Sequence, residues 1–283
     1  SKNRRGRTGV SLVGCADIAR GRRLGIGDRR TVAAWVASGP RSRTSSAGAG
    51  QDGAEGPKNG PRRGGVMRVV IASDKFKGTL TAREAADAMA RAVRERWPDA
   101  VVAVIPIADG GDGTLDALGG ANRRDTVTGP LGRPVEARWR LDGGFAVIES
   151  AAASGLVLAG GAEGNDPWGA TSRGVGELVA RAIDAGAARI VVGMGGSAMT
   201  DGGRGAIEVL GDLAPFAPGR VVVLTDTTVA FDDAARVFAP QKGADAALVD
   251  RLTARLHADA AEWLTRFGAD VRGIPRTGAA GGL

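Results

Sequence analysis

A glycine-rich segment, residues 193–205, contains the groups of this chain best suited to binding an anion. It reads GMGGSAMTDGGRG and lies between an apolar run at 189–192 and a second one at 206–210. A strand, a glycine turn and a helix start leave backbone N–H groups and the positive end of a helix dipole beside one concavity. The segment matches neither GxGxxG nor GxxxxGK[ST], so the common nucleotide fingerprints do not apply. It predicts a phosphate site, with a structural glycine turn as the alternative.

Carboxylates provide a second kind of chemistry. Asp109 and Asp112 lie among glycines in the segment ADGGDGT, and Asp201 lies inside the glycine-rich segment. The later Glu of an EF-hand loop is missing, which disfavours calcium. Mg²⁺ held by one or two carboxylates together with phosphate oxygens fits better. Acidic capping of a helix N-terminus is the alternative interpretation.

Three lysines are candidates for neutralising a phosphate or a substrate carboxylate. Lys75 and Lys77 follow the first predicted strand, and Lys242 lies in the tight loop FAPQKG. Taken alone, Lys75 and Lys77 are better explained as ordinary solvated lysines, and the alternative for the loop of Lys242 is a turn shaped by Pro240 and Gly243. The single histidine, His257, is expected to face solvent, so a general base must be a carboxylate. Zinc sites and Cys- or Ser–His-based nucleophiles are disfavoured.

Alternating strands and helices must position these residues. We expect strands over 68–72, 101–105, 145–148, 189–192 and 220–224, and helices over 82–97, 176–185, 206–210 and 246–267. Thr81 and Glu84 have capping-box spacing, and Asp245 is the expected cap of the last helix. Apolar spacing places Trp97 on the apolar face of the first helix and predicts an amphipathic last helix with its stripe from Leu248 to Phe267. The alternation predicts an α/β fold with parallel strands in its first β-α-β unit.

The polar candidates share one place in this pattern, because each group follows the end of a predicted strand. Residues 74–77, 109–114, 149–154, 193–205 and 225–227 all do so. Ligands of open parallel sheets bind beyond the carboxyl ends of the strands. The sequence therefore predicts that these five loops form one site.

Charge divides the chain into two parts. Residues 1–66 carry 14 basic and 4 acidic residues, whereas residues 67–283 carry 24 basic and 27 acidic ones. The body of the chain has no basic stripe and no tyrosine, which argues against nucleic-acid binding. One cysteine, Cys15, is compatible with a reducing cytoplasm, and no apolar run is long enough to span a bilayer.

Residues 1–66 are rich in Arg, Gly and Ser and lack sustained periodicity. Such a segment is expected to be disordered or a non-native extension, with Met67 as the true start. A transit peptide is a second interpretation. Nucleic-acid binding confined to this segment is a third.

The ordered set of motifs resembles the glycerate kinase family of the bacterial type. The matching segments are 74–78 (DKFKG), 108–114 (ADGGDGT), 127–132 (VTGPLG), 151–155 (AAASG), 171–174 (TSRG), 195–198 (GGSA) with 201–203 (DGG), 240–244 (PQKGA) and 278–282 (GAAGG). The resemblance extends from Met67 to Leu283. It departs from the family at Thr200, where Asn is usual, and the family continues beyond the last motif, which implies a C-terminally truncated chain.

The resemblance implies a fold of two α/β domains around a cleft, one of them flavodoxin-like (Rossmann-like) and discontinuous. The first domain would comprise residues 67–125 and 273–283, with its C-terminal part missing, and the second residues 126–272. The implied activity is transfer of the γ-phosphate of ATP, with Mg²⁺, to a hydroxyl of D-glycerate in the cytoplasm. A non-catalytic metabolite-binding protein is the alternative. No nucleic-acid or membrane partner is expected, and the oligomeric state stays open.

The expected site follows from this reading. The catalytic candidates are Asp109, Asp201 and Lys77, and the metal ligands are Asp109 and Asp112; the division of roles between base and metal ligand stays open. The residues expected to bind ATP are Gly195, Gly196, Ser197, Thr200, Gly202 and Gly203. The residues expected to bind substrate are Asp74, Lys75, Ser154, Asp226 and Lys242.

Overall fold

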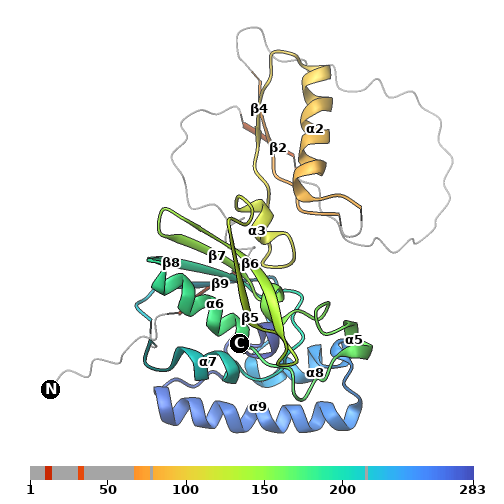
Figure 1. Ribbon diagram of the computed structural model, residues 1–283. Coiled ribbons are helices and arrows are strands. Elements are labelled where there is room, and N and C mark those ends of the chain that lie inside the picture. The colour runs from red at the N-terminus through yellow and green to blue at the C-terminus, as the bar shows by residue number, and fades with distance from the viewer. Residues whose placement is uncertain (1–9, 15–30, 35–66, 77–78, 214–215) are drawn as a thin grey trace, which may run out of the picture. The chain divides into compact units, whose positions relative to one another are not determined.

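The computed structural model describes residues 10–14, 31–34, 67–76, 79–213 and 216–283 (Figure 1). The chain divides into two compact units. One comprises residues 1–22 and 108–283, and the other comprises residues 23–107. Lys77 lies outside the described residues, as does most of the segment 1–66.

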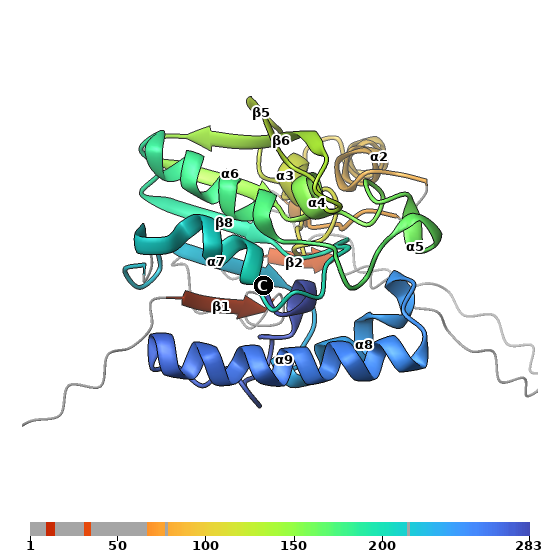
Figure 2. The same cartoon turned by 60° about the horizontal axis from the view of Figure 1, so that its bottom comes forward.

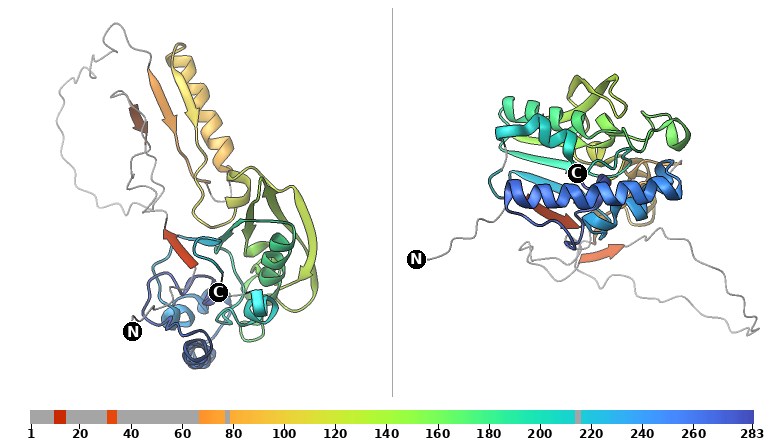
Figure 3. Two further views of the ribbon diagram at one scale, coloured as in Figure 1. Left: turned by 90° about the vertical axis from the view of Figure 1, so that its left-hand side faces the viewer. Right: turned by 90° about the horizontal axis from the view of Figure 1, so that it is seen from below.

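The smaller unit is a three-stranded parallel sheet with one helix. Its strands are β2 (Thr31–Ala34), β3 (Arg68–Ile71) and β4 (Val101–Val104), in the order β2-β3-β4, and its helix is α2 (Ala82–Arg96). Ile71 packs with Ala86 and Ala90 of α2, which lies along β3 and β4 (Figure 3). The predicted parallel β-α-β unit is confirmed.

Helix α2 begins and ends where its sequence signals lie. The Glu84 N–H donates to Thr81 Oγ1 at 3.2 Å, and the Thr81 N–H donates to Glu84 Oε2 at 2.8 Å, which completes the capping box. The placement of Trp97 on the apolar face is wrong, because the helix ends at Arg96 and the Trp97 side chain is 40% exposed. The Arg96 guanidinium lies over its ring instead.

Thr81→Ala is expected to lower the free energy of unfolding by about 1 kcal/mol, because the first turn of α2 loses its side-chain acceptor. Urea unfolding followed by circular dichroism measures the change. Thr81→Ser keeps the hydroxyl and is expected to retain most of the stability. Equal losses in both variants would contradict a role for the cap.

The larger unit contains a six-stranded mixed sheet in the order β1-β9-β8-β7-β6-β5. Its strands are β1 (Val10–Gly14), β5 (Arg123–Thr128), β6 (Pro134–Asp142), β7 (Phe145–Glu149), β8 (Arg189–Gly193) and β9 (Val221–Thr225). Strands β7, β8, β9 and β1 are parallel, whereas β5 and β6 form an antiparallel hairpin that continues into β7. The α/β class is confirmed, and the sheet is mixed rather than wholly parallel.

Two described strands come from the segment that was expected to lack order. Strand β1 pairs in parallel with β9, and β2 pairs in parallel with β3. Both stretches contain β-branched residues, which are suited to a sheet. For the segment 1–66 as a whole, the expectation of disorder or of a non-native extension stays a prediction.

Helices cover this sheet and form a second layer. They are α3 (Thr114–Ala117), α4 (Ala151–Ser154), α5 (Gly161–Gly164), α6 (Arg173–Asp184), α7 (Arg204–Leu210), α8 (Ala234–Phe238) and α9 (Ala246–Phe267), with 3₁₀ turns η1 (Gly211–Leu213), η2 (Phe231–Asp233), η3 (Pro240–Lys242) and η4 (Ala279–Gly281). Figure 2 shows α6 and α7 side by side and α8 next to α9. Gly176 permits the close helix contact, because a Cβ there would lie 2.7 Å from the Cα of Ala206.

None of the helices in the described ranges has the length and apolarity that a membrane crossing requires.

Helix α9 has its own apolar core. Leu252, Leu256 and Trp263 on one face pack with Phe231 of η2, which confirms the predicted amphipathic stripe. The predicted cap is also confirmed, because the Leu248 N–H donates to Asp245 Oδ1 at 2.8 Å. The apolar cluster around α9 is separate from the core that the sheet forms with α4 and α6.

The C-terminal segment packs inside the larger unit. The Gly278 N–H donates to the Val229 carbonyl at 3.0 Å, and the Gly202 N–H donates to the Gly281 carbonyl at 3.0 Å. Residues 273–283 thus belong to the same compact unit as residues 108–272. The division into domains at residues 125 and 272 stays a prediction.

Candidate active site

The glycine-rich loop after β8 lies between two other loops of the larger unit. The Gly195 N–H donates to the Gly110 carbonyl at 2.8 Å. On the other side, the Leu156 N–H donates to the Gly196 carbonyl at 2.8 Å. Gly110 has a φ of +90°, and a Cβ there would lie 2.2 Å from the carbonyl oxygen of Leu224. The loops that follow β7 and β8 therefore meet the loop of Asp109 at one end of the sheet.

Only the tip of the glycine-rich loop is accessible. Gly196 is exposed and Gly195 half-buried, whereas residues 197–203 are buried. The N–H groups of Gly202 and Gly203 already donate within the protein, to the Gly281 carbonyl and to Asp201 Oδ1. The Gly195 N–H is used in the same way, by the Gly110 carbonyl, so Gly196 at the exposed tip is the predicted ATP-binding residue best placed to meet a phosphate.

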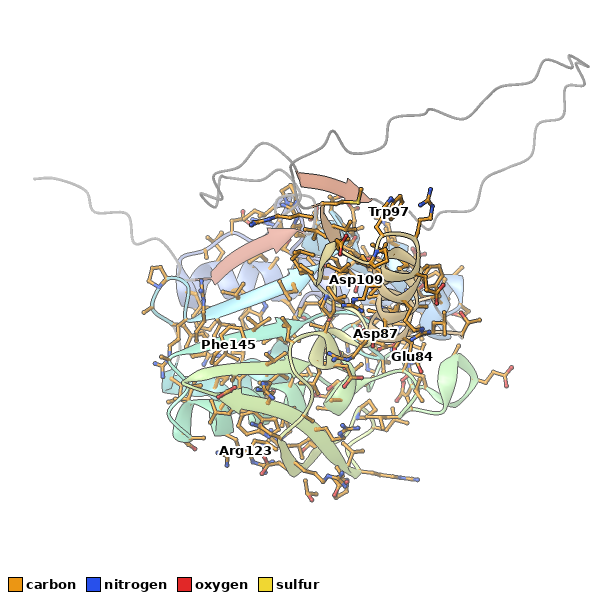
Figure 4. All side chains as sticks on the ribbon, turned by 90° about the horizontal axis from the view of Figure 1, so that it is seen from above. Glu84, Asp87, Trp97, Asp109, Arg123 and Phe145 are labelled. Carbon is orange, nitrogen blue, oxygen red and sulfur yellow. The ribbon has the colours of Figure 1, made fainter. Side chains whose placement is uncertain are left out.

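Two acidic residues belong to the loop that meets this tip. Asp109, labelled in Figure 4, is half-buried, and its Oδ1 accepts from the Gly111 N–H at 2.8 Å. Asp112 is exposed, and its Oδ1 lies 2.9 Å from the position that a Cβ on Gly196 would occupy. The structure thus brings Asp112 to the glycine tip, with Asp109 in the same short loop.

Glu149 is a further acid at this end of the sheet. It closes β7, and its Oε1 accepts from the Leu115 N–H at 2.8 Å. Burial raises the pKa of Glu149, and the negative charges of Asp112 and Asp116 raise it further. A carboxyl that holds its proton more tightly than usual next to ionised neighbours is common at catalytic sites and in structural networks.

The acid cluster fits Mg²⁺ in the way that phosphate-transfer sites use it. No group of three or more His, Cys, Asp or Glu side chains among the described residues is arranged to hold a metal ion. Mg²⁺ is often bound through one or two carboxylates, with phosphate oxygens and waters completing its shell. Asp112, exposed beside an accessible glycine tip, meets that requirement.

The Asp201 carboxylate is buried among hydrogen-bond donors of the protein. Its Oδ2 accepts from the N–H and the Oγ of Ser172, both at 2.8 Å, and from the Gly205 N–H at 3.2 Å. Its Oδ1 accepts from the Gly203 N–H at 3.3 Å, and the side chain is 8% exposed. The carboxylate therefore ties the starts of α6 and α7 together. This geometry supports a structural role and not the predicted one as base or metal ligand.

Lys242 also points inward. Only 3% of the residue is exposed, and its Nζ donates to the Met199 carbonyl at 2.5 Å and to Ser197 Oγ at 3.1 Å. Burial lowers the pKa of Lys242 to about 8, although the nearby charge of Asp201 acts in the opposite direction. The ammonium that was predicted to contact substrate instead holds the buried half of the glycine-rich loop.

The depressed pKa of Lys242 predicts a rise of stability with pH. The unfolded chain keeps the lysine proton up to pH 10.5, whereas the folded protein loses it from about pH 8. The unfolded state therefore binds more protons between these values, and the free energy of unfolding increases across that window. Urea unfolding should show a gain on the order of 3 kcal/mol that is absent in Lys242→Met. The chain has no tyrosine, so no phenol group titrates in this pH window and adds to the change in stability. Identical pH profiles for both proteins would contradict the prediction.

The three predicted hydroxyl residues are buried. Ser197 is 8% exposed, and its Oγ accepts from Lys242 Nζ. Ser154 and Thr200 are fully buried, and neither hydroxyl has a hydrogen-bond partner among the described residues. Their direct contact with substrate or ATP receives no support from this arrangement.

The remaining predicted residues lie elsewhere. Asp226 is exposed directly after β9. Asp74 and Lys75 belong to the smaller unit, where they follow β3, and Asp74 Oδ1 accepts from the Lys75 N–H at 2.7 Å. Their part in the site stays a prediction, as does that of Lys77.

A groove of about 420 Å³ lies beside the turn of the β5–β6 hairpin. It is lined by Pro130, Leu131, Arg133, Val135, Leu158, Ala159, Gly160 and Gly164. Arg133 is the one charged residue of this lining.

Comparison with known proteins adds independent evidence. The sequence matches the glycerate kinase family over residues 69–216 and 216–283. It is 39% identical over 254 residues to Glycerate 2-kinase of Escherichia coli K12, with 77% of this chain and 66% of that protein covered. It is 39% identical over 257 residues to Glycerate kinase of Bacillus subtilis 168, with the same coverage.

A solved structure agrees with these sequence matches. A crystal structure from Salmonella typhimurium LT2, described provisionally as glycerate kinase 2, superposes with a TM-score of 0.68 at 36% identity and covers 77% of this chain and 68% of that one. The chain spans just under two thirds of the length of the two relatives named above. With matching sequence over most of residues 69–283 and a matching fold, the chain belongs to the glycerate kinase family.

Proposed function

We propose that this chain carries the phosphate-binding part of an enzyme that transfers the γ-phosphate of ATP to a hydroxyl of D-glycerate. The observation that supports the proposal best is Asp112 beside the accessible tip at Gly195 and Gly196, with Asp109 in the same loop. Phosphoryl transfer depends mainly on positioning and on neutralising charge, and an acidic Mg²⁺ site next to the exposed backbone of Gly196 can do both. Family membership supports the choice of reaction.

The roles of the residues follow from their positions. The backbone N–H of Gly196 would contact the phosphates, and Asp112, with Asp109 in the same loop, would hold Mg²⁺. Mg²⁺, when bound, neutralises the charge on the transferred phosphoryl group. Asp109 would accept the proton that the glycerate hydroxyl loses as its oxygen bonds to the γ-phosphorus and ADP leaves.

Two further assignments rest on the family alone. The arrangement of two α/β domains with one flavodoxin-like domain is proposed on that basis, as is a cytoplasmic location. The name of the E. coli relative favours the 2-hydroxyl as the acceptor.

An ADP-release assay with MgATP and D-glycerate tests the proposal. We expect turnover that requires both substrates and Mg²⁺, and ³¹P NMR of the product identifies which hydroxyl is phosphorylated. L-glycerate serves as the stereochemical control. Binding of both ligands without turnover would favour the non-catalytic alternative, and failure to bind MgATP would refute the proposal.

A further inference from the structure

The buried half of the glycine-rich loop is held by side chains that come from other elements. Four of its carbonyl oxygens accept side-chain hydrogen bonds. The donors are Asn165 Nδ2 to Ala198 at 3.2 Å, Lys242 Nζ to Met199 at 2.5 Å, Arg255 Nη2 to Thr200 at 2.7 Å and Trp263 Nε1 to Gly202 at 3.2 Å.

Three of these donors belong to the helical layer of the C-terminal half. Lys242 lies in η3, while Arg255 and Trp263 lie on α9, whose apolar face packs with η2 and α8. A glycine-rich segment has little stiffness of its own, because glycine restricts the backbone least. The path of this loop is therefore fixed by hydrogen bonds from side chains of helices that pack in their own apolar cluster.

Arg255 makes the most extensive contacts of the four donors. Its Nη2 binds the Thr200 carbonyl, and its Nη1 donates to the Trp168 carbonyl at 2.7 Å. The same guanidinium lies 4.4 Å from the centre of the Trp168 ring. Within the described residues, none of its hydrogen bonds reaches Asp109, Asp112 or Gly196. Arg255 can thus influence the accessible tip through the backbone of the loop.

We infer that Arg255 is a positioning residue that fixes the Gly195–Gly203 loop through the carbonyl of Thr200 and so sets the geometry of the tip that contacts phosphate. The consequence for nucleotide binding rests on the proposed function. The consequence for the loop itself does not, since it follows from the hydrogen bond alone.

Arg251 provides a matched control on the same helix. It lies one turn before Arg255, and its guanidinium is 4.5 Å from the centre of the same Trp168 ring. It has no hydrogen bond to the loop among the described residues. Arg255→Met and Arg251→Met therefore both remove a cation from Trp168, but only the first leaves the Thr200 carbonyl without its charged donor.

Hydrogen exchange and calorimetry on the full chain test the inference. In Arg255→Met, amide exchange across residues 194–203 should rise about tenfold, while exchange in α6 and the melting temperature change little. The affinity for MgATP should fall by a similar factor while that for D-glycerate is kept. Arg251→Met should match the unsubstituted protein in both measurements, and Arg255→Lys, which retains one donor, should recover part of the loss.

Each other outcome is decisive. Equal exchange in Arg255→Met and Arg251→Met overturns the inference, because the loop then does not depend on this hydrogen bond. Faster loop exchange with unchanged MgATP affinity also overturns it, since Arg255 would be merely structural. If the unsubstituted protein does not bind MgATP, the proposed function fails, and the exchange comparison alone decides whether Arg255 fixes the loop.

Discussion

Asp109→Asn is expected to lower kcat for phosphate transfer at least about a hundredfold without lowering the melting temperature. Asparagine keeps an oxygen that can accept from the Gly111 N–H, so the fold of the loop is retained. It removes the negative charge that would take the hydroxyl proton and help to hold Mg²⁺. Steady-state ADP release and differential scanning calorimetry measure the two effects.

Asp116→Asn is the matched control for this experiment. Asp116 is exposed on α3 and contributes to the same negative field around Glu149, but it lies outside the 108–114 loop. Its substitution should leave kcat within a few-fold of the unsubstituted value. Near-normal kcat in Asp109→Asn would remove Asp109 from the mechanism.

Asp201→Asn is expected to destabilise the protein by about 3–5 kcal/mol, the range typical of breaking a buried charged network. Both oxygens of Asp201 accept hydrogen bonds, and three of the donors are backbone N–H groups of Ser172, Gly203 and Gly205. In asparagine an NH₂ group replaces one of the two oxygens. Its hydrogens would face a backbone N–H, and that N–H would lose its acceptor. Urea unfolding provides the measurement.

A second readout separates this role from a catalytic one. The charge of Asp201 raises the pKa of Lys242, so its removal should shift the alkaline stability profile to lower pH. Asp226→Asn, which changes an exposed residue after β9, should alter neither property. Normal stability with lost turnover in Asp201→Asn would return Asp201 to the list of catalytic candidates.

Local signals in the sequence were sufficient for most of the elements. The caps at Thr81 and Asp245 and the apolar spacing of α9 depend on neighbours in the same helix, and all three were predicted correctly. The β5–β6 hairpin was not predicted, because its stability depends on pairing with β7 across the sheet. The position of Trp97 was wrong because it depends on one residue at the helix end.

The meeting of these loops at one end of the sheet was predictable, but the orientation of several of their side chains was not. The rule that ligands bind beyond strand ends located Asp109, Gly195 and Glu149, although Glu149 was not selected as a site residue. The same rule could not show that Asp201 and Lys242 point inward, because their partners Ser172 and Met199 come from distant parts of the chain. Arg255 gave no local signal, since its role depends on a carbonyl 55 positions away.

The close backbone contacts at Gly110 and Gly176 limit how this protein can be engineered. Exchanging glycine for alanine is a common way to stiffen a chain and raise its thermal tolerance. At these two positions the added methyl would meet the Leu224 carbonyl oxygen at 2.2 Å or the Ala206 Cα at 2.7 Å. Libraries aimed at a hardier variant should therefore leave both positions unaltered and draw their diversity from surface turns.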